Sequence, residues 1–368
     1  MAALGRLRRR PSWDWAAPTS VHLALAALAI ALTLALIGSF TLDGWQRALS
    51  GWDSHWYLLL GRQGYPARLG PQWAYFPLYP ALIAALVHLG APALWAALLL
   101  SLAGTAALVI CLGRLAEIEL GPELRSWPAW LLLLSPFGFF FSAAYTEALF
   151  FALVAGCMLC ARRGRFGWAG VLGALAAATR VTGLFLLLGV LLEALQQAGW
   201  DPRRLNPRAG LAALVPLGTV AYGAYSQLRL GDWLAFSRAE SLYFGLRLAW
   251  PWQGLATTWG AATGSSAYLR GAFTPEVVAG LLGVPILALA IWRLRPLYWS
   301  FMLLSWLAAV SLTFWRSVPR YELAFFPALL LLVELSRHAR WLRWAWVVAG
   351  GGAMAYGASV FARGLWLN

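Results

Sequence analysis

Charged residues are scarce in this chain, making up 11% of its 368 residues, whereas hydrophobic residues make up 61%. The mean hydropathy is +0.68. A water-soluble protein cannot hide that much apolar surface, so the composition excludes an ordinary soluble domain. A membrane-spanning helix needs a run of about 20 apolar residues, and uncharged runs recur from Val21 to the C-terminus. The composition therefore predicts a multi-pass membrane protein.

Several common kinds of functional site are missing from the sequence. There is no glycine-rich dinucleotide motif, no P-loop, no zinc-protease motif and no set of kinase motifs. The three cysteines, Cys111, Cys157 and Cys160, lie inside apolar runs without a histidine or cysteine cluster beside them, so apolar filling is favoured over a redox pair or a zinc site. An enzyme of this kind must take its activated substrate from the membrane.

Lysine is absent, and all 28 basic residues are arginine, which gives a net charge of +14. The arginines are scattered between the apolar runs and do not form one stripe, so the sequence predicts no nucleic-acid partner. The 23 tryptophans are typical of the interfacial belts of a membrane protein.

The hydrophobic pattern predicts an all-α membrane protein of about eleven transmembrane helices in a single domain, residues 1–368. The expected spans are 21–40, 93–111, 127–141, 148–160, 166–178, 183–195, 209–228, 277–292, 297–315, 323–335 and 344–361. A shorter apolar run with two prolines, residues 76–89, is expected to form a juxtamembrane or re-entrant helix. Two long connections remain, residues 41–92 and 231–275, and we expect both on the external face.

The arginines predict the orientation of the chain. If residues 76–89 do not cross the membrane, 17 of the 28 arginines fall on one face, nearly all in short turns. This asymmetry is typical of cytoplasmic loops. We therefore expect a protein of the plasma membrane with an uncleaved first span, a cytoplasmic N-terminus and an external C-terminus. The connections rich in Trp, Tyr, Asp, Glu and His then lie outside, where any chemistry is expected.

The first external connection carries the leading candidate, Asp53. It lies between Trp52 and Trp56, beside His55 and Tyr57. A carboxylate between two tryptophans at the membrane surface is partly desolvated and is a competent base. The structural alternative, an interfacial aromatic cluster in which Asp53 caps a short helix, has equal weight on spacing alone.

Other candidates lie in the shorter external turns. Glu147 enters a span, where it is either a second acid near Asp53, holding a metal or an acceptor hydroxyl, or a favourable charge at a helix start. Arg180 and Arg320 are natural ligands for a lipid phosphate, because the guanidinium group matches phosphate oxygens. The structural alternative for Arg320, which precedes Tyr321, is snorkelling or an ion pair such as one with Glu322. Arg238 and Glu240 are candidates of lower weight.

A series of motifs follows along the chain: Trp52-Asp53-Ser54, Trp56-Tyr57, Gly64-Tyr65, Phe76-Pro77-Leu78-Tyr79-Pro80, Ser135-Pro136, Phe141-Ser142-Ala143-Ala144-Tyr145-Thr146-Glu147, Thr179-Arg180, Gly231-Asp232 with Phe236, and Pro319-Arg320-Tyr321. In these residues and in this order, the sequence resembles the GPI mannosyltransferase 2 (PIG-V-type) family and its bacterial relatives. The match in the first external connection is quite specific, whereas the later pieces are individually weak.

The resemblance implies a GT-C glycosyltransferase fold with a long first external loop that carries a catalytic acid. It also implies an inverting enzyme that moves a sugar, expected to be mannose, from a polyprenyl-phosphate donor to a glycan or glycolipid acceptor. By this analogy Asp53 is the catalytic base, and Arg180 and Arg320 hold the lipid phosphate. His55, Tyr57, Glu147, Arg238 and Tyr321 are further expected substrate-binding residues.

The resemblance leaves several points open. The acidic pair of some related enzymes is missing, so no cofactor is predicted and the involvement of a divalent metal stays open. The sequence does not identify the acceptor.

A transporter or lipid-carrier flippase is the alternative function, although most acids lie in loops or at helix ends, not at the membrane midplane, and no convincing internal repeat is present. Glu193 and Glu334 are expected to be capping or paired. A third candidate is a non-catalytic membrane scaffold, but that function would not explain why the polar and aromatic groups gather on one face.

Overall fold

The computed structural model describes residues 16–365, which form α-helices, short 3-10 helices and an isolated bridge between Leu248 and Leu312. The all-α expectation is confirmed. The α-helices are α1 (Ala16–Leu36), α2 (Leu42–Leu49), α3 (Asp53–Gln63), α4 (Leu78–His88), α5 (Ala93–Leu120), α6 (Trp127–Leu133), α7 (Glu147–Arg162), α8 (Phe166–Thr179), α9 (Leu186–Gln197), α10 (Leu217–Leu230), α11 (Ala235–Phe244), α12 (Pro251–Thr263), α13 (Ala267–Arg293), α14 (Pro296–Val310), α15 (Val318–Tyr321), α16 (Ala328–Leu335) and α17 (Arg340–Ala362). The 3-10 helices are η1 (Pro71–Ala74), η2 (Gly138–Phe141), η3 (Val181–Phe185), η4 (Pro202–Arg204), η5 (Pro207–Leu214) and η6 (Glu322–Phe325).

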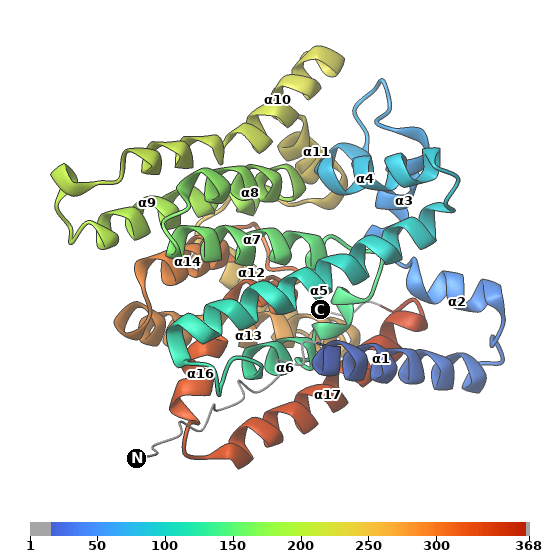
Figure 1. Ribbon diagram of the computed structural model, residues 1–368. Helices are drawn as coiled ribbons and strands as arrows, with labels where there is room; N and C mark the ends of the chain where they lie inside the picture. The colour runs from blue at the N-terminus through green and yellow to red at the C-terminus, as the bar shows by residue number, and fades with distance from the viewer. Residues whose placement is uncertain (1–15, 366–368) are drawn as a thin grey trace.

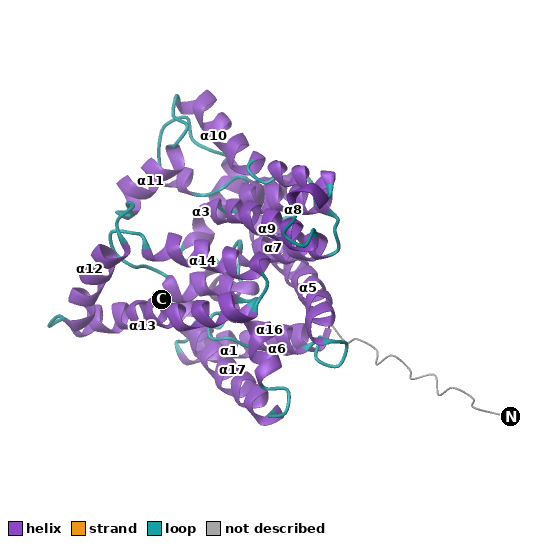
Figure 2. Ribbon diagram, turned by 90° about the vertical axis from the view of Figure 1, so that its left-hand side faces the viewer, coloured by secondary structure: helices purple, strands orange, loops and turns teal. Residues whose placement is uncertain are grey.

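The bundle is built around the contact between α5 and α7, which carries much of the largest core cluster (Figure 1). α7 packs in turn against α8, and α8 against α10, whereas α1 and α17 lie side by side at the other edge of the bundle. The helices α11 and α12 lie away from this core, on the side that Figure 2 shows at the left. They belong to the expected second external connection.

Several apolar segments are long enough for a membrane. Five helical segments combine sufficient length and hydropathy, namely Ala16–Leu36, Ala93–Leu120, Pro207–Leu230, Ala267–Arg293 and Arg340–Ala362. Four shorter apolar helices accompany them. The chain is therefore a multi-pass membrane protein, and the count of eleven spans stays a prediction.

Prolines divide three of the expected spans. The segment 127–141 consists of α6 and η2, separated by a turn that contains Pro136. Pro216 separates η5 from α10, and Pro327 separates η6 from α16. Proline has no N–H and its ring clashes with the preceding helical turn, so at these three positions it ends a helix that hydrophobicity alone would continue, whereas α13 continues through Pro275 and Pro285. The second long connection also ends earlier than expected, because α13 begins at Ala267, within residues 231–275.

Two features of the expected first external connection, residues 41–92, agree with the sequence. The run 76–89 forms α4, an eleven-residue helix that is too short to cross a bilayer alone. α3 packs on α4 and begins at Asp53 itself. The residue before it, Trp52, has φ +55, a conformation that costs energy for a side chain of this size. The candidate acid thus lies at the first position of a helix, after a strained turn.

The start of α7 is fixed by a close helix contact. Gly104 of α5 lies against the backbone of Ala148, where a Cβ atom would be 2.7 Å from the carbonyl carbon. Only glycine allows this approach without displacing α7. This contact sets the position of Glu147, the first residue of α7.

Basic turns gather at the opposite end of α7. Arg125 lies 3.7 Å from Glu117 near the end of α5, and Arg337 donates a hydrogen bond to the carbonyl of Leu120. Arg162, the last residue of α7, is bound to Glu119. The structure therefore places these expected cytoplasmic arginines at one end of the bundle. The N-terminal arginines, Arg6 and Arg8–Arg10, and the last residues of the expected external C-terminus lie outside the described residues.

Candidate active site

A cavity of about 280 Å³ lies at the end of α7 that carries Glu147. Residues from α3, α7, α8, α11, α14 and the α15 turn line it, together with the segment around Tyr75. Its walls are mostly apolar and aromatic, and its charged side chains are Asp53, Arg180, Glu240, Arg316 and Arg320. A largely apolar cavity with a few convergent charged groups is the usual form of a small-molecule site.

Asp53 is held by partners on both of its carboxylate oxygens. Tyr75 donates its hydroxyl hydrogen to Oδ1 at 3.1 Å, and Arg320 donates from Nη1 to Oδ2 at 3.0 Å. The backbone N–H of Asp53 donates to the hydroxyl of Tyr145 at 3.3 Å. The side chain is 25% exposed, so it is fixed in place and still reaches the cavity.

Glu147 and the two arginines form a second set of contacts. Arg180 Nη1 lies 2.8 Å from Glu147 Oε1, and Arg320 Nε lies 3.7 Å from the same oxygen. Glu147 is 2% exposed, so its charge depends on these arginines for compensation. Because Arg320 also binds Asp53, one guanidinium group joins the two acids, and Glu147 lies near Asp53 as one of the two interpretations of the sequence expected.

Aromatic rings surround the two arginines. The ring of Tyr321 lies 5.4 Å from the guanidinium carbon of Arg180 and 5.4 Å from that of Arg320. Phe150 faces Arg180, and Phe140 faces Arg320. Cation–π contacts of this kind favour the charged form and hold the planar groups in a fixed direction. Both side chains are positioned before any ligand arrives.

Within the described residues, each of these arginines uses only Nη1 for a hydrogen bond. An arginine carries five N–H donors in a planar fork. Arg180 and Arg320 therefore keep N–H groups that a bound anion can take. Both side chains line the cavity, so such an anion is within reach.

Tyr57 supports the acid from the α3 side. Its ring packs edge-on against Tyr75 at 5.0 Å and against Tyr79 at 5.3 Å, and its hydroxyl lies 3.5 Å from the hydroxyl of Thr146. Burial raises its pKa well above the ordinary value, with Arg180 acting in the opposite direction. Tyr57 is therefore neutral and holds Tyr75 against Asp53.

The segment that carries Arg320 is anchored by Glu276, which sequence reasoning missed. The carboxylate of Glu276 accepts the backbone N–H of Ser317 at 2.5 Å and that of Val318 at 2.7 Å. Ser317 has φ +60, so the turn before α15 is strained, as is the turn before Asp53. Glu276 lies inside an apolar helix, where a buried acid needs a partner. An acid within an apolar run was therefore the sequence feature that could have identified it.

Glu240 contributes a further acid to the cavity. Burial raises its pKa to about 7, the negative charge of Asp53 adds to the effect, and the charges of Arg316, Arg320 and Arg180 oppose it. Among residues 16–365 its carboxylate has no hydrogen-bond or ion-pair partner. In the sequence, Glu240 was a candidate of lower weight.

Three expected substrate-binding residues, His55, Arg238 and Glu147, do not line the cavity. His55 is exposed and packs edge-on against Trp56 at 5.1 Å. Arg238 is 61% exposed and pairs with Asp232 at 3.2 Å. His55 and Arg238 lie outside the lining because α3 and α11 each turn another face, the one that carries Asp53 or Glu240, toward the cavity. Glu147 does not line the cavity itself, but it contacts Arg180 and Arg320, which do.

In the part of the chain that the structure describes, no group of three or more His, Cys, Asp or Glu side chains gathers in a way that could hold a metal ion. The two acids closest to the arginines, Asp53 and Glu147, are each engaged by a guanidinium group.

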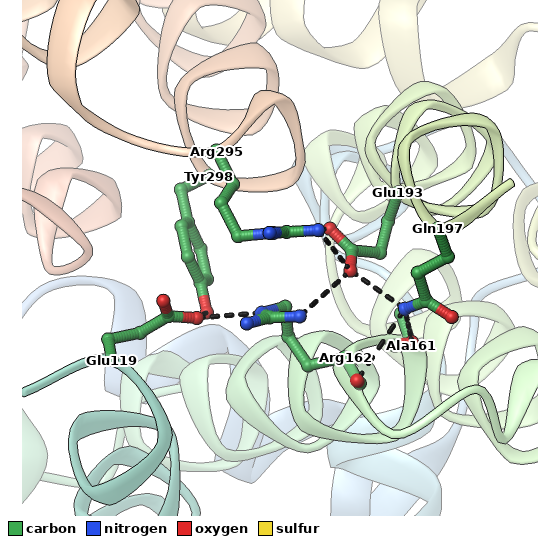
Figure 3. A network of polar contacts seen from close by, with 7 residues as sticks. All are labelled: Glu119, Ala161, Arg162, Glu193, Gln197, Arg295 and Tyr298. Atoms are coloured by element: carbon green, nitrogen blue, oxygen red, sulfur yellow. Dashed lines mark hydrogen bonds and ion pairs between the residues drawn. The ribbon is translucent and has the colours of Figure 1, made fainter. Parts of the chain in front are cut away.

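A second polar network lies at the opposite end of α7 (Figure 3). Glu193 accepts hydrogen bonds from Arg162 at 3.1 Å and from Arg295 at 3.0 and 3.1 Å. Glu119 accepts from Arg162 and from Tyr298, both at 2.7 Å. The expectation that Glu193 is paired is confirmed, and Glu334 is likewise paired, with Arg337 at 2.8 Å. This network ties α5, α7, α9 and α14 together and takes no part in the cavity.

Known proteins resemble the chain both in sequence and in fold. It is 29% identical to human GPI alpha-1,6-mannosyltransferase 2 over 212 residues, which are 51% of this chain and 42% of that protein. The rat protein of the same name is 33% identical over 205 residues, covering 49% of this chain and 41% of the relative. The match thus spans less than half the length of these relatives. No family model matches the chain.

Among solved structures, ArnT from Cupriavidus metallidurans bound to undecaprenyl phosphate superposes with a TM-score of 0.55 and 16% identity, covering 90% of this chain and 62% of that one. A likeness at this identity concerns the fold alone. The expected GT-C-type fold is thereby confirmed. The chain is a multi-pass membrane protein of the GT-C fold, similar over about half of its sequence to GPI alpha-1,6-mannosyltransferase 2.

Proposed function

We propose that the protein is an inverting membrane glycosyltransferase that transfers a sugar, mannose in the first instance, from a polyprenyl-phosphate donor to a hydroxyl-bearing acceptor. The observation that carries the proposal is that Asp53, Arg180 and Arg320 face one cavity. A base for the acceptor and two cations for the donor phosphate are the groups that this reaction needs. The likeness to a named mannosyltransferase supports the choice of sugar.

The reaction uses Asp53 as the base. Its carboxylate takes the proton from the acceptor hydroxyl as the hydroxyl oxygen forms a bond to the anomeric carbon. The bond between that carbon and the phosphate oxygen breaks on the opposite side, and polyprenyl phosphate leaves with the electron pair. Phosphate is a good leaving group that needs no general acid, so one carboxylate is sufficient, whereas glycosidases use two.

The arginines stabilise the charge that grows on the departing phosphate. Arg180 and Arg320 are fixed by Glu147 and by the rings around them, so their free N–H groups need little reorganisation. Glu147 serves as the anchor of both cations and Tyr321 as their aromatic support, while Tyr57 holds Tyr75 against Asp53. This arrangement fits a phosphate-linked donor better than a neutral one.

We propose further that the cavity faces the external leaflet of the plasma membrane. The basic turns lie at the opposite end of the bundle, as expected of cytoplasmic loops. The end of α17 lies on the same side of the membrane as the cavity in this proposal, because Trp52, next to Asp53, donates a hydrogen bond to the carbonyl of Leu365 at 3.2 Å. A transporter is less favoured, because Glu276, a buried acid in an apolar helix, is bound to backbone N–H groups and has no need of a transported ion.

The test is transfer of radiolabelled mannose from a short-chain polyprenyl-phosphate donor by purified protein in vesicles, with the variants Asp53→Asn and Asp43→Asn at equal amounts. Asp43 is an exposed acid of the neighbouring helix α2 and serves as the control. We expect product from the unaltered protein and from Asp43→Asn, and none from Asp53→Asn. Product from all three would remove Asp53 from the mechanism, and absence of product with any polyprenyl-phosphate sugar would reject the function.

A further inference from the structure

The helix α11 presents a regular stripe of side chains to the cavity. Phe236, Glu240 and Phe244 all line it, and they follow one another at intervals of four residues, which places them on one face of a helix. The buried residues Ala235 and Ala239 belong to the cluster that packs α11 onto Trp73 of η1. The stripe is therefore held in place by a small apolar interface.

Aromatic contacts fix both ends of this stripe. Phe76 packs edge-on against Phe236 at 5.4 Å, and Tyr75 packs edge-on against Phe244 at 6.2 Å. The carboxylate of Glu240 thus lies between two rings that have neighbours of their own. A carboxylate flanked by rings is suited to a ring-shaped, hydroxyl-bearing ligand, because its two oxygens accept hydrogen bonds from hydroxyl groups while the apolar face of the ligand contacts the aromatic carbons.

The charges divide the cavity into two walls. Arg180 and Arg320 are bound to Glu147 and Asp53 and form a cationic wall suited to an anion. The stripe of α11 carries a single acid and no cation that lines the cavity. Arg316 also lines the cavity, and its charge, like those of Arg320 and Arg180, acts on Glu240. The stripe and the two paired arginines nevertheless come from different elements, so an anionic donor phosphate and a neutral acceptor can occupy different parts of the cavity.

Asp53 lies where the two walls meet. Its Oδ2 binds Arg320 of the cationic wall, and its Oδ1 binds Tyr75, which packs on Phe244 of the stripe. A hydroxyl bound at the stripe would approach Asp53 from the Tyr75 side, whereas a phosphate bound by Arg320 would lie on the Oδ2 side. Such a placement would suit attack opposite to the leaving group.

We propose that Phe236, Glu240 and Phe244 form the acceptor subsite, and that it takes a neutral sugar or polyol head group whose hydroxyls donate hydrogen bonds to Glu240. This inference rests on the proposed function and deepens it. Glu240 determines which hydroxyl of the acceptor meets Asp53, so it governs acceptor choice and the regiochemistry of the product, whereas donor binding depends on the arginine wall.

The experiment uses the full chain in vesicles, a short-chain polyprenyl-phosphate mannose donor and octyl α-mannoside as the acceptor probe. Rates are measured with each substrate varied in turn, and transfer to water is measured without acceptor. The variants are Glu240→Gln, Phe244→Leu and the matched control Glu334→Gln, an exposed acid at the other end of the bundle. Loss of the charge-assisted hydrogen bonds should raise the acceptor KM of Glu240→Gln by about tenfold or more.

The donor KM and transfer to water should stay unchanged in Glu240→Gln, and Phe244→Leu should likewise raise the acceptor KM alone. Thermal unfolding of each variant shows whether it is folded. If Glu240→Gln does not fold, Phe244→Leu still tests the subsite. Unchanged acceptor KM in folded variants overturns the subsite, as does a rise in donor KM. Absence of any transfer by the unaltered protein, with donor and acceptor varied, overturns the proposed function and the subsite with it, so the two failures are distinguishable.

Discussion

Asp53 and Arg320 form an ion pair with 3.0 Å between Oδ2 and Nη1, although they lie 267 residues apart in the chain. Each follows a strained turn, at Trp52 with φ +55 and at Ser317 with φ +60. Residues in sparsely populated backbone conformations cost about 1–3 kcal/mol each and persist only where the surrounding structure enforces them. The acid and the cation are therefore held together by the fold.

Replacing Asp53 by asparagine should abolish transfer and leave the fold intact. The amide keeps the size of the side chain and still accepts a hydrogen bond from Arg320, but it cannot take a proton from an acceptor. General-base catalysis contributes about 10²–10⁴-fold, so the initial rate should fall by at least that range. Tyr75→Phe, which removes only the hydroxyl bond to Oδ1, should retain most of the rate. Equal losses in the two variants would mean that positioning, not proton transfer, explains the effect.

Lysine at position 320 or 180 should weaken use of the donor. A lysine is a compact charge that cannot make the planar, multiply bonded contacts of a guanidinium group. Removing one stabilising donor from a developing oxyanion costs about 10²–10³-fold in rate, and we expect a loss of this size in donor kcat/KM. Arg229→Lys, at an exposed position at the end of α10, is the control. A purely acceptor-dependent defect in Arg320→Lys would contradict the assignment of the arginine wall.

Glu276→Gln should lower both stability and activity. Its two oxygens accept the N–H groups of Ser317 and Val318, and the amide nitrogen of glutamine cannot accept either. An unsatisfied buried donor costs about 1–3 kcal/mol, which thermal unfolding would detect. Because the same turn leads to Arg320, donor kcat/KM should fall as well. A lower unfolding temperature with unchanged kinetics at a temperature where the variant is folded would limit Glu276 to a structural role.

The pH dependence of acceptor use should report on Glu240. Its pKa is raised from 4.5 to about 7 by burial and by Asp53, against the opposing charges of Arg180, Arg316 and Arg320. The carboxylate is thus largely protonated below that pH and ionised above it, so its capacity to accept hydrogen bonds grows as the pH rises through about 7. Acceptor kcat/KM should rise over this interval in the unaltered protein. The rise should be missing in Glu240→Gln, and identical profiles would contradict the role.

Glu193→Gln should destabilise the bundle without changing substrate use. Glu193 is fully buried and compensates Arg162 and Arg295 in the network of Figure 3. Removing one partner of a buried ion pair costs about 3–5 kcal/mol. Since the network lies at the end of α7 opposite the cavity, both KM values should remain as they were. A change in either KM would show that the two ends of α7 are coupled.

Much of the helical pattern follows from hydrophobicity, because the bilayer requires apolar runs and leaves few other solutions. The runs at 93–111 and 344–361 correspond to α5 and α17, and 76–89 to α4. Three expected spans are divided at a proline, as at Pro136, because the hydropathy of an apolar segment is the same whether the helix is continuous or broken. The early start of α13 at Ala267 is a different failure, since that helix continues through Pro275 and Pro285.

The candidate site was predictable only in part. Asp53 stood out by its flanking tryptophans, and Arg180 by its unusual place between apolar segments. Glu276 and Glu240 did not, because their importance comes from neighbours far away in sequence, Val318 in one instance and Asp53 in the other. The exposure of His55 and Arg238 depends on which face of α3 and α11 meets the cavity, and spacing alone does not determine that face.

The long sequence separation of Asp53 and Arg320 also bears on how the protein is made. Chains fold progressively from the N-terminus during synthesis, so α3 is inserted with its acid long before the cation that compensates it. The cavity cannot close until α15 has left the ribosome and reached α3. A chain that stops before residue 318 should therefore hold an incomplete pocket, with Glu147 lacking one of its two arginines and Asp53 lacking its only ion-pair partner among the described residues.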